Sequence, residues 1–238
     1  MILLNFYAPL RGTLLAVICA IGMIAALPAA AQTGPSAIEK AQYQGLHAAA
    51  QKVDVAQIEK LAALKTGLNA RDSNGRTPLH VATFARQRGA IRALVKASAD
   101  INLLDNDRYD GVTIASVADD EETLRLLLSL GGNAKLITSR YDGTALIAAA
   151  HLGHDGVVKQ LIAAGAPLDH VNNLHWTALI EVIVLGNGGA RHQESLRALL
   201  AAGASHQLTD RHGVTPLQLA KSRGYAEMVQ MLEKAGAR

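Results

Sequence analysis

The sequence predicts an all-α solenoid, in which helix–turn–helix units stack side by side and short hairpin fingers join each unit to the next. Thr144-Ala145-Leu146 returns one repeat later as Thr177-Ala178-Leu179, and a period of about 33 residues indicates a stacked repeat. Two apolar runs separated by Gly153-His154 fill the interval and account for one pair of helices. Aromatic residues make up 3% of the chain, which is few for a sandwich or α/β core and suits small, closely packed helices.

Residues 1–31 are predicted to be a cleavable signal peptide. Arg11 precedes an apolar run at 14–27, and an Ala-x-Ala site ends at Ala31. The run is shorter than the roughly 20 apolar residues of a spanning helix, although an uncleaved anchor stays open as the alternative. We therefore expect export without membrane insertion after cleavage, and a periplasmic location if the source is a Gram-negative bacterium. Cleavage removes Cys19, the single cysteine, which excludes thiol catalysis and Cys-ligated zinc.

The charge of the chain argues against nucleic acid as a partner. The formal net charge is +3, or +2 without Arg11, which is too low for a phosphate-binding surface. The charges are nevertheless unevenly spread, with six basic residues and one acid in 71–98, and eight acids and one base in 100–122. These stretches are either solvated faces that compensate each other or a bipolar contact surface across two units.

The repeat domain is predicted to span 42–238, after a disordered polar linker at 32–41. It holds about six units, of which the first is degenerate and fits a terminal cap. When each unit is aligned on its Thr position, the spacing drifts around the period of about 33 residues. The aligned residues are Gln44, Thr77, Thr113, Thr144, Thr177 and Thr215.

The second and last units carry a recognisable motif. Residues 77–82 read Thr-Pro-Leu-His-Val-Ala, and 215–220 differ from this pattern at the His. With this motif and period the chain resembles an ankyrin-repeat protein, and 141–177 resembles exported bacterial members of that family. Thr can cap the helix, and Pro fits the first turn because its missing N–H would be unpaired there. The resemblance implies that His80 locks the turn through the backbone and Thr77. The repeat-motif residues are Thr77, Pro78, Leu79, His80, Thr144, Thr177, Thr215 and Pro216.

Three units depart from the pattern. Arg86 stands where the glycine between the two helices is usual, so that helix must end without a left-handed glycine. In unit three, aligned on Thr113, the preceding finger at 105–110 is about three residues longer than the pattern, and the helix pair three residues shorter. Unit five carries a five-residue insertion, which predicts a flexible loop at 186–193 between its helices.

No catalytic residue, metal site or cofactor is predicted, and we expect a protein that is not an enzyme. His47 and His80 fall at the turn-locking position, and no histidine pair has the helical spacing of a zinc hydrolase. His170, His175 and His212 could approach one another in adjacent fingers, which keeps a metal or small-molecule binder as the second alternative. The acids at 119–122 fit the first turn of an outer helix.

The candidate partner-binding residues are Arg108, Tyr109, Arg140, Tyr141, Trp176 and Glu181. Tyr109, Tyr141 and Trp176 are expected at comparable places on three successive fingers, which would make an aromatic row, and interfaces favour Trp and Tyr. Glu181 lies on a short inner helix. It is either partly exposed or hydrogen-bonded to a neighbouring finger, or it anchors a basic side chain of a partner. The loop 187–193 would form a flexible rim.

The sequence thus indicates a protein-interaction module that binds a protein partner. The resemblance implies that the binding surface is the concave groove made of inner helices and finger tips. A first alternative is an accessory or inhibitor protein of an exported enzyme. We expect a monomer.

Overall fold

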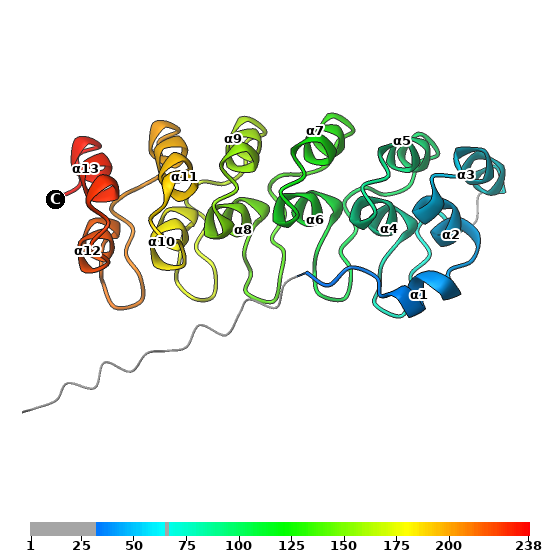
Figure 1. The fold of residues 1–238 in the computed structure, drawn as a ribbon, viewed down its shortest axis with the longest axis horizontal. Helices are drawn as coiled ribbons and strands as arrows, with labels where there is room; N and C mark the ends of the chain where they lie inside the picture. Colours follow the sequence, from blue (N-terminus) through cyan, green and yellow to red (C-terminus); the bar gives the residue numbers. More distant parts are fainter. Residues whose placement is uncertain (1–31, 65–66) are drawn as a thin grey trace, which may run out of the picture. The chain divides into compact units, whose positions relative to one another are not determined.

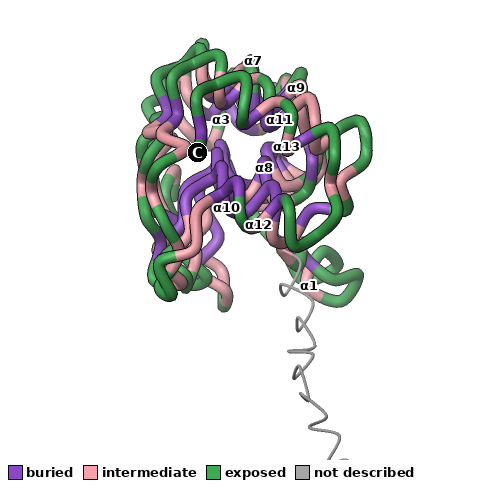
Figure 2. Tube along the Cα trace, turned by 90° about the vertical axis from the view of Figure 1, so that its left-hand side faces the viewer, coloured by how far each residue is buried: buried purple, intermediate pink, exposed green. Residues whose placement is uncertain are grey.

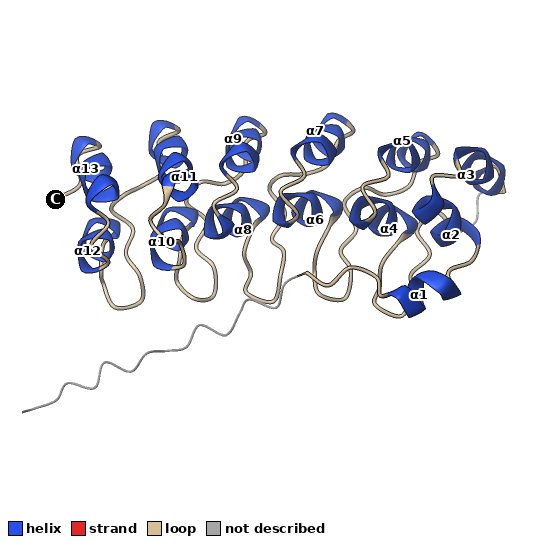
Figure 3. Ribbon diagram, viewed as in Figure 1, coloured by secondary structure: helices blue, strands red, loops and turns tan. Residues whose placement is uncertain are grey.

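The computed structural model describes residues 32–64 and 67–238, and this part of the chain holds thirteen helices joined by turns and fingers (Figure 1, Figure 3). In these residues the one bridge of the β type pairs Thr138 with Gly143. The prediction of an all-α fold is confirmed. The helices are α1 (Ala37–Gln42), α2 (Gly45–Lys52), α3 (Val55–Ala62), α4 (Pro78–Phe84), α5 (Arg88–Lys96), α6 (Gly111–Val117), α7 (Glu121–Ser129), α8 (Ala145–Leu152), α9 (Asp155–Ala163), α10 (Ala178–Val184), α11 (Ala190–Ala201), α12 (Pro216–Ser222) and α13 (Ala226–Lys234).

The helices from α2 onward form two layers. The inner layer holds α2, α4, α6, α8, α10 and α12, and the outer layer holds α3, α5, α7, α9, α11 and α13 (Figure 1). Each helix packs on its partner within the unit and on the helices of the same layer in neighbouring units. A single unit cannot bury its apolar face, so the stack itself creates the core.

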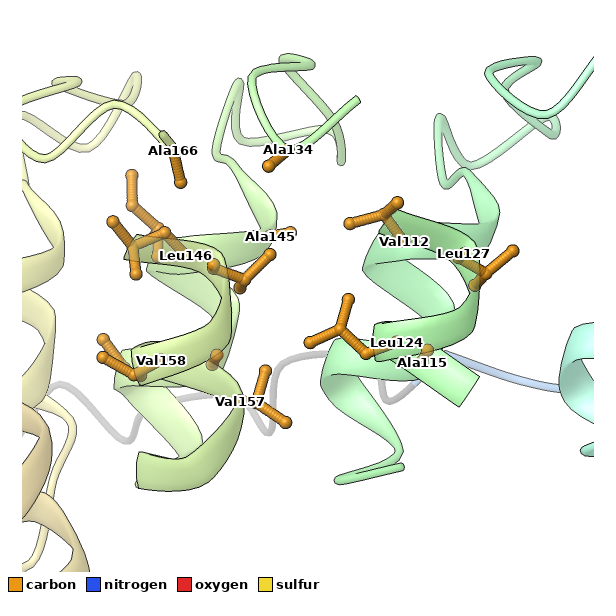
Figure 4. Packing of buried hydrophobic residues seen from close by; sticks show 14 of the residues in the cluster. Val112, Ala115, Leu124, Leu127, Ala134, Ala145, Leu146, Val157, Val158 and Ala166 are labelled. Carbon is orange, nitrogen blue, oxygen red and sulfur yellow. The ribbon is translucent and has the colours of Figure 1, made fainter. Parts of the chain in front are cut away.

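One hydrophobic cluster runs through all six units. Figure 4 shows Val112 and Leu124 of unit three on the side that faces Val157 of unit four, whereas Leu127 points to the other side of unit three, and all four side chains are buried. Full burial of such a side chain stabilises the fold by roughly 1.5–3 kcal/mol. The inner layer is largely buried and the outer turns are exposed (Figure 2).

Unit three is regular, contrary to the alignment on Thr113. The residue that caps α6 is Asp110, whose Oδ1 accepts the N–H of Thr113 at 2.9 Å. Measured from Asp110, the spacing back to Thr77 equals the regular period, and the spacing forward to Thr144 exceeds it by a single position. The predictions of a longer finger and a shortened helix pair were therefore wrong. Asp caps a helix as well as Thr does, and the Thr three residues later hid the substitution.

The turn-locking histidines are confirmed. Nδ1 of His80 accepts the backbone N–H of Thr77 at 3.0 Å, and Nε2 of the same ring lies 3.0 Å from the carbonyl oxygen of Tyr109. His47 reaches the Arg76 carbonyl at 2.9 Å in the same way. Each histidine therefore ties its inner helix to the end of the next finger.

Arg86 closes α4 as predicted, without a glycine. Its φ is +56°, a left-handed conformation, and the corresponding turns use Asp119 at +52° and Gly153 at +68°. A side chain in this region costs roughly 1–2 kcal/mol relative to glycine. In units two and three, packing in the stack offsets the cost of this left-handed conformation.

The insertion in unit five is helical for much of its length. Helix α10 ends at Val184 and α11 starts at Ala190, and α11 has 12 residues where α9 has 9. Arg191 pairs with Asp119 and Asp155 at 2.9 and 3.1 Å. The predicted flexible loop at 186–193, and with it the flexible rim at 187–193, is wrong for 190–193, because these residues add a turn of helix held by ion pairs.

The predicted linker is also ordered against the repeats. Ser36 caps α1, and Arg76 binds the Thr33 carbonyl at 2.8 Å and the Glu39 carboxylate at 2.9 Å. Tyr43 donates to Asp72 at 2.8 Å. Residues 32–43, here called the N-terminal strap, therefore belong to the folded unit and are not a disordered tether.

The predicted signal peptide at 1–31 lies outside the described residues. In the part that the structure describes, no helix is both long enough and apolar enough to cross a bilayer.

Candidate protein-binding surface

Five fingers alternate with the inner helices. In each finger the first N–H donates to the last carbonyl, and the pairs are, from the first finger to the fifth, Asp72–Arg76, Asp105–Tyr109, Thr138–Gly143, Asn172–Trp176 and Asp210–Val214. The tips of neighbouring fingers are also joined through the backbone. Asn106 donates to Asn74, Ser139 to Arg108 and Asn173 to Tyr141, each at 3.0 Å. The fingers and inner helices thus form one connected surface, here called the finger face.

Arg108 and Arg140 lie exposed on two adjacent fingers and pair crosswise. The guanidinium of Arg108 is 2.8 Å from Asp142, and that of Arg140 is 3.4 Å from Asp107. Exposed pairs of this kind contribute about 0–1 kcal/mol each. Both cations are therefore available to a partner at small cost, although each already has an acidic neighbour.

The expected aromatic row is incomplete. Tyr109 and Trp176 end their fingers and are half-buried, so these two positions do correspond. The corresponding residue of the third finger is Gly143, because that finger has one additional residue. Tyr141 lies earlier in the finger and is 41% exposed. The prediction that it occupies the same finger position as Tyr109 and Trp176 was therefore wrong.

Glu181 is buried, with 5% of its surface exposed. Its Oε1 accepts the side-chain N–H of Asn172 at 2.8 Å, and its Oε2 lies 3.5 Å from Nδ1 of His151. Burial raises the pKa of Glu181 to about 7. The expectation of a hydrogen bond to a finger is confirmed, and that of partial exposure is wrong. The same position in the other units is apolar, with Ala48, Val81, Ile114, Ala148 and Leu219.

His151 contributes a second perturbed group from α8. Burial lowers its pKa, and the neighbouring His192 and His154 lower it further. Near neutral pH the imidazole is therefore mostly uncharged while Glu181 is partly protonated. The 3.5 Å contact between them is consequently a largely neutral pair and not a full salt bridge.

Sequence reasoning missed Asn172 and Arg76. Asn172 stands where three other fingers start with an Asp (Asp72, Asp105 and Asp210), so a comparison of finger starts could have found it. Arg76, buried at 6% exposure, directly precedes the motif at 77–82. Its role is to bind the strap, which is distant from it in the sequence.

The finger histidines His170, His175 and His212 form no metal-binding group in the described residues. Nε2 of His170 lies 2.6 Å from the carbonyl oxygen of Asp142. Among the described residues no three His, Cys, Asp or Glu side chains are arranged to hold a metal ion.

The unevenly charged stretches pair with each other. Arg88 lies 2.6 Å from Glu122 and 3.4 Å from Asp120, and Arg86 lies 3.6 Å from Asp120. The basic side chains of unit two thus neutralise the acidic side chains of unit three at the turns between the helices. This favours the interpretation as solvated, compensating faces over a bipolar contact surface.

Comparison with known families follows the repeat pattern. The model for ankyrin repeats (3 copies) matches residues 112–210 and 146–238, and the model for a single ankyrin repeat matches 74–106. The chain belongs to the ankyrin repeat family. The matched models are those of a repeat that serves as a general protein-interaction module, and no catalytic family is among them.

Bacterial ankyrin proteins are among its similar proteins. The putative ankyrin repeat protein YahD of Escherichia coli (strain K12) is 37% identical over 190 residues, which covers 79% of this chain and 94% of YahD. The crystal structure of an ankyrin repeat domain (ABAYE2397) from Acinetobacter baumannii AYE is 45% identical with a TM-score of 0.76, over 81% of this chain and 98% of that one.

A second solved structure shares the fold at lower identity. It is a complex of the Bd0816 predatory endopeptidase from Bdellovibrio bacteriovorus with the immunity protein Bd3460. One chain of it matches at 24% identity and a TM-score of 0.62, over 81% of this chain and 98% of that one.

Proposed function

We propose that this chain is an exported, non-enzymatic module that binds a partner protein through its finger face. The observation that carries the proposal is an exposed apolar set on and directly before two adjacent fingers, in a stack whose family serves as a general interaction module. Tyr141 is 41% exposed, and Ile137 and Val171, which directly precede the third and fourth fingers, are 45% and 44% exposed. Because the backbone bond from Asn173 to Tyr141 joins these two fingers, a partner that covers both can bury apolar surface on each, which favours association.

The surrounding residues supply polarity and rigidity. Arg108 and Arg140 flank this set with exposed cations, and Arg is among the residue types that interfaces favour. The backbone bonds between finger tips hold the surface in one shape, which reduces the entropy lost on binding.

The test is a pull-down with the folded protein from the compartment in which the chain resides. The doubly substituted protein Tyr141→Ala and Trp176→Ala is compared with the wild type and with an outer-helix control, Gln230→Ala in α13. We expect the partners to be lost with the double variant and retained with the control. Retention of the same partners with unchanged helicity would remove this surface from consideration.

Export is tested separately. Cell fractionation and mass spectrometry of the amino terminus should find a chain that starts at Gln32 in the exported fraction. A chain that begins at Met1 in the cytoplasm would overturn this part of the proposal and leave the binding surface untouched.

A second candidate function is that of an inhibitor or accessory protein of an exported enzyme. It is favoured by the structural likeness to a chain in the complex of an endopeptidase with its immunity protein, although that likeness concerns the fold. This function predicts a stoichiometric complex with one exported enzyme and a change in that enzyme's activity. A partner without enzymatic activity would exclude it.

A further inference from the structure

Glu181 differs from the other buried acids of the described residues, which are Asp105, Asp110 and Asp120. Each of those three carboxylates accepts at least two hydrogen bonds from backbone or side-chain donors. Glu181 accepts one, from Asn172, and its second oxygen has the imidazole of His151 at 3.5 Å as its ion-pair contact. A buried carboxyl with so little compensation is costly for the fold, which points to a role beyond packing.

The chain itself shows how the finger face holds a segment of polypeptide. The N-terminal strap contacts the first finger and the inner helix α4, which follows that finger. On the finger, Arg76 binds Glu39 and the Thr33 carbonyl. On the inner helix, Gly34 lies so close to Phe84 that an added Cβ would sit 3.1 Å from its ring. A charged side chain of the strap thus pairs with an opposite charge that the surface supplies.

In unit five the surface supplies a charge of the opposite sign, and it does so from a different position. Trp176 occupies the finger position that Arg76 has in unit two, and the acid is supplied by the surface, as Glu181 of the inner helix. A carboxyl on the inner helix suits a Lys or Arg side chain, which can pair with its oxygen. The indole of Trp176 ends the finger that leads into this helix, and such a ring can stack on a cation.

We propose that Glu181 is the recognition point for a Lys or Arg side chain of the partner protein, which pairs with the carboxyl oxygen beside His151. This rests on the proposed binding function and names the chemistry of its partner. The carboxyl must be ionised to bind the cation, so any proton on it passes to solvent when the complex forms.

The proton gives the interaction a pH dependence. With the pKa of Glu181 at about 7, the affinity for a cation should fall up to tenfold for each pH unit below that value. His151 from α8 faces the carboxyl, with His154 and His192 behind it, and its protonation at lower pH would compete with the partner's cation. From α12 no described charged group lies within ion-pair distance of Glu181.

The first experiment needs no partner. Carbon-13 NMR of the Glu181 carboxyl follows its titration with acetyl-Gly-Arg-Gly-amide at up to about 50 mM, above the millimolar affinity expected of one charged contact. The citrulline peptide is the neutral control. We expect the arginine peptide to lower the pKa of Glu181 and the citrulline peptide to leave it unchanged. An unchanged titration with both peptides would overturn the proposal.

The second experiment uses a partner captured by the finger face. Glu181→Gln can still accept the Asn172 hydrogen bond, and Glu227→Gln on α13 is the matched control. We expect the first variant to weaken binding at pH 8 about tenfold or more, and the second to have no effect. Equal affinity of wild type and Glu181→Gln between pH 6 and 8 would contradict the cation site without contradicting the proposed binding function. The absence of any partner would contradict the binding function instead.

Discussion

Asn172 donates its side-chain N–H to Glu181 at 2.8 Å and uses its carbonyl oxygen to accept the backbone N–H groups of Leu174 and Trp176 at 3.0 Å each. The carbonyl shapes the finger, as the carboxylates of Asp72 and Asp210 do in theirs. The amide N–H compensates the buried acid. A finger and an inner helix therefore depend on one side chain.

Glu181→Gln should change how stability depends on pH. The pKa of Glu181 is raised from 4.5 to about 7, so the folded state binds more protons than the unfolded state between these values. Wild-type stability consequently falls as pH rises through this window, by at most about 3 kcal/mol. The variant should lack this loss and be the more stable protein at pH 8. Urea unfolding of both proteins at pH 5 and 8 measures it, and equal slopes with pH would contradict the prediction.

Asn172→Asp should destabilise the protein by about 2–3 kcal/mol at pH 8. The substitution keeps the oxygen that shapes the finger but removes the N–H donor and sets a carboxylate against Glu181. Combination with Glu181→Gln should recover most of the loss, because the new amide can donate to the new carboxylate. A double-mutant cycle by chemical unfolding measures the coupling, and additive effects would show that the two side chains act independently.

Arg76→Met should release the N-terminal strap. The substitution leaves Glu39 and Asp72 without their cation. Because the Glu39 side chain is 26% exposed, the loss should be smaller than the roughly 3–5 kcal/mol of a fully buried pair. Trypsin should then cleave after Lys40 much faster than in the wild type. The control is Arg92→Met, at an exposed position of α5. If Lys40 stays protected in the Arg76 variant, the strap is held by other contacts.

Gly186→Ala should disturb the turn of unit five. A Cβ at Gly186 would lie 2.1 Å from the Val182 carbonyl oxygen and 2.6 Å from the His192 ring, and relief of such a clash costs roughly 1–3 kcal/mol. Gly189→Ala is the matched control, since its Cβ would meet the Asn187 side chain at 3.0 Å and that side chain can move. Thermal unfolding of both variants measures the difference.

The start of α11 should be ordered in solution. Hydrogen exchange should show protection at Gln193, whose N–H donates to the carbonyl of Gly189. Rapid exchange there would favour a flexible loop after all.

Asp110→Thr should leave stability unchanged or raise it slightly, whereas Asp110→Ala should cost about 1–2 kcal/mol through loss of the helix cap. Burial raises the pKa of Asp110, and its Oδ2 is buried without a hydrogen-bond partner, so Thr keeps the cap and removes that atom. Thermal unfolding should place the Ala variant about 2–8 °C below the Thr variant. Equal melting temperatures for the two variants would show that the cap contributes nothing.

Much of the fold was predictable because its signals are local. The motif at 77–82, the repeat period and the apolar spacing each act within one unit. Unit three was misaligned because Asp110 and Thr113 are both residue types that cap helices. The insertion in unit five was predicted, but its helical part was not, and the ion-pair partners of Arg191 in that part come from units three and four.

The candidate site was less predictable than the fold. The sequence pointed to Tyr141, Trp176 and Glu181 as residues that differ from plain scaffold. Exposure then separated them, with Tyr141 on the surface and Glu181 buried. Export and the signal peptide remain predictions.

The sequence by itself determined the repeat, its caps and the stacking of paired helices, since these follow from residue types a few positions apart. Only the tertiary structure decided that the strap binds Arg76, and that His151 meets the buried side chains of Asn172 and Glu181. Glu181 and His151 belong to different units, and Arg76 is separated from Thr33 by more than a whole repeat. The burial and pKa of each group depend on what a different unit places beside it, and the pattern within a single repeat carries no such information.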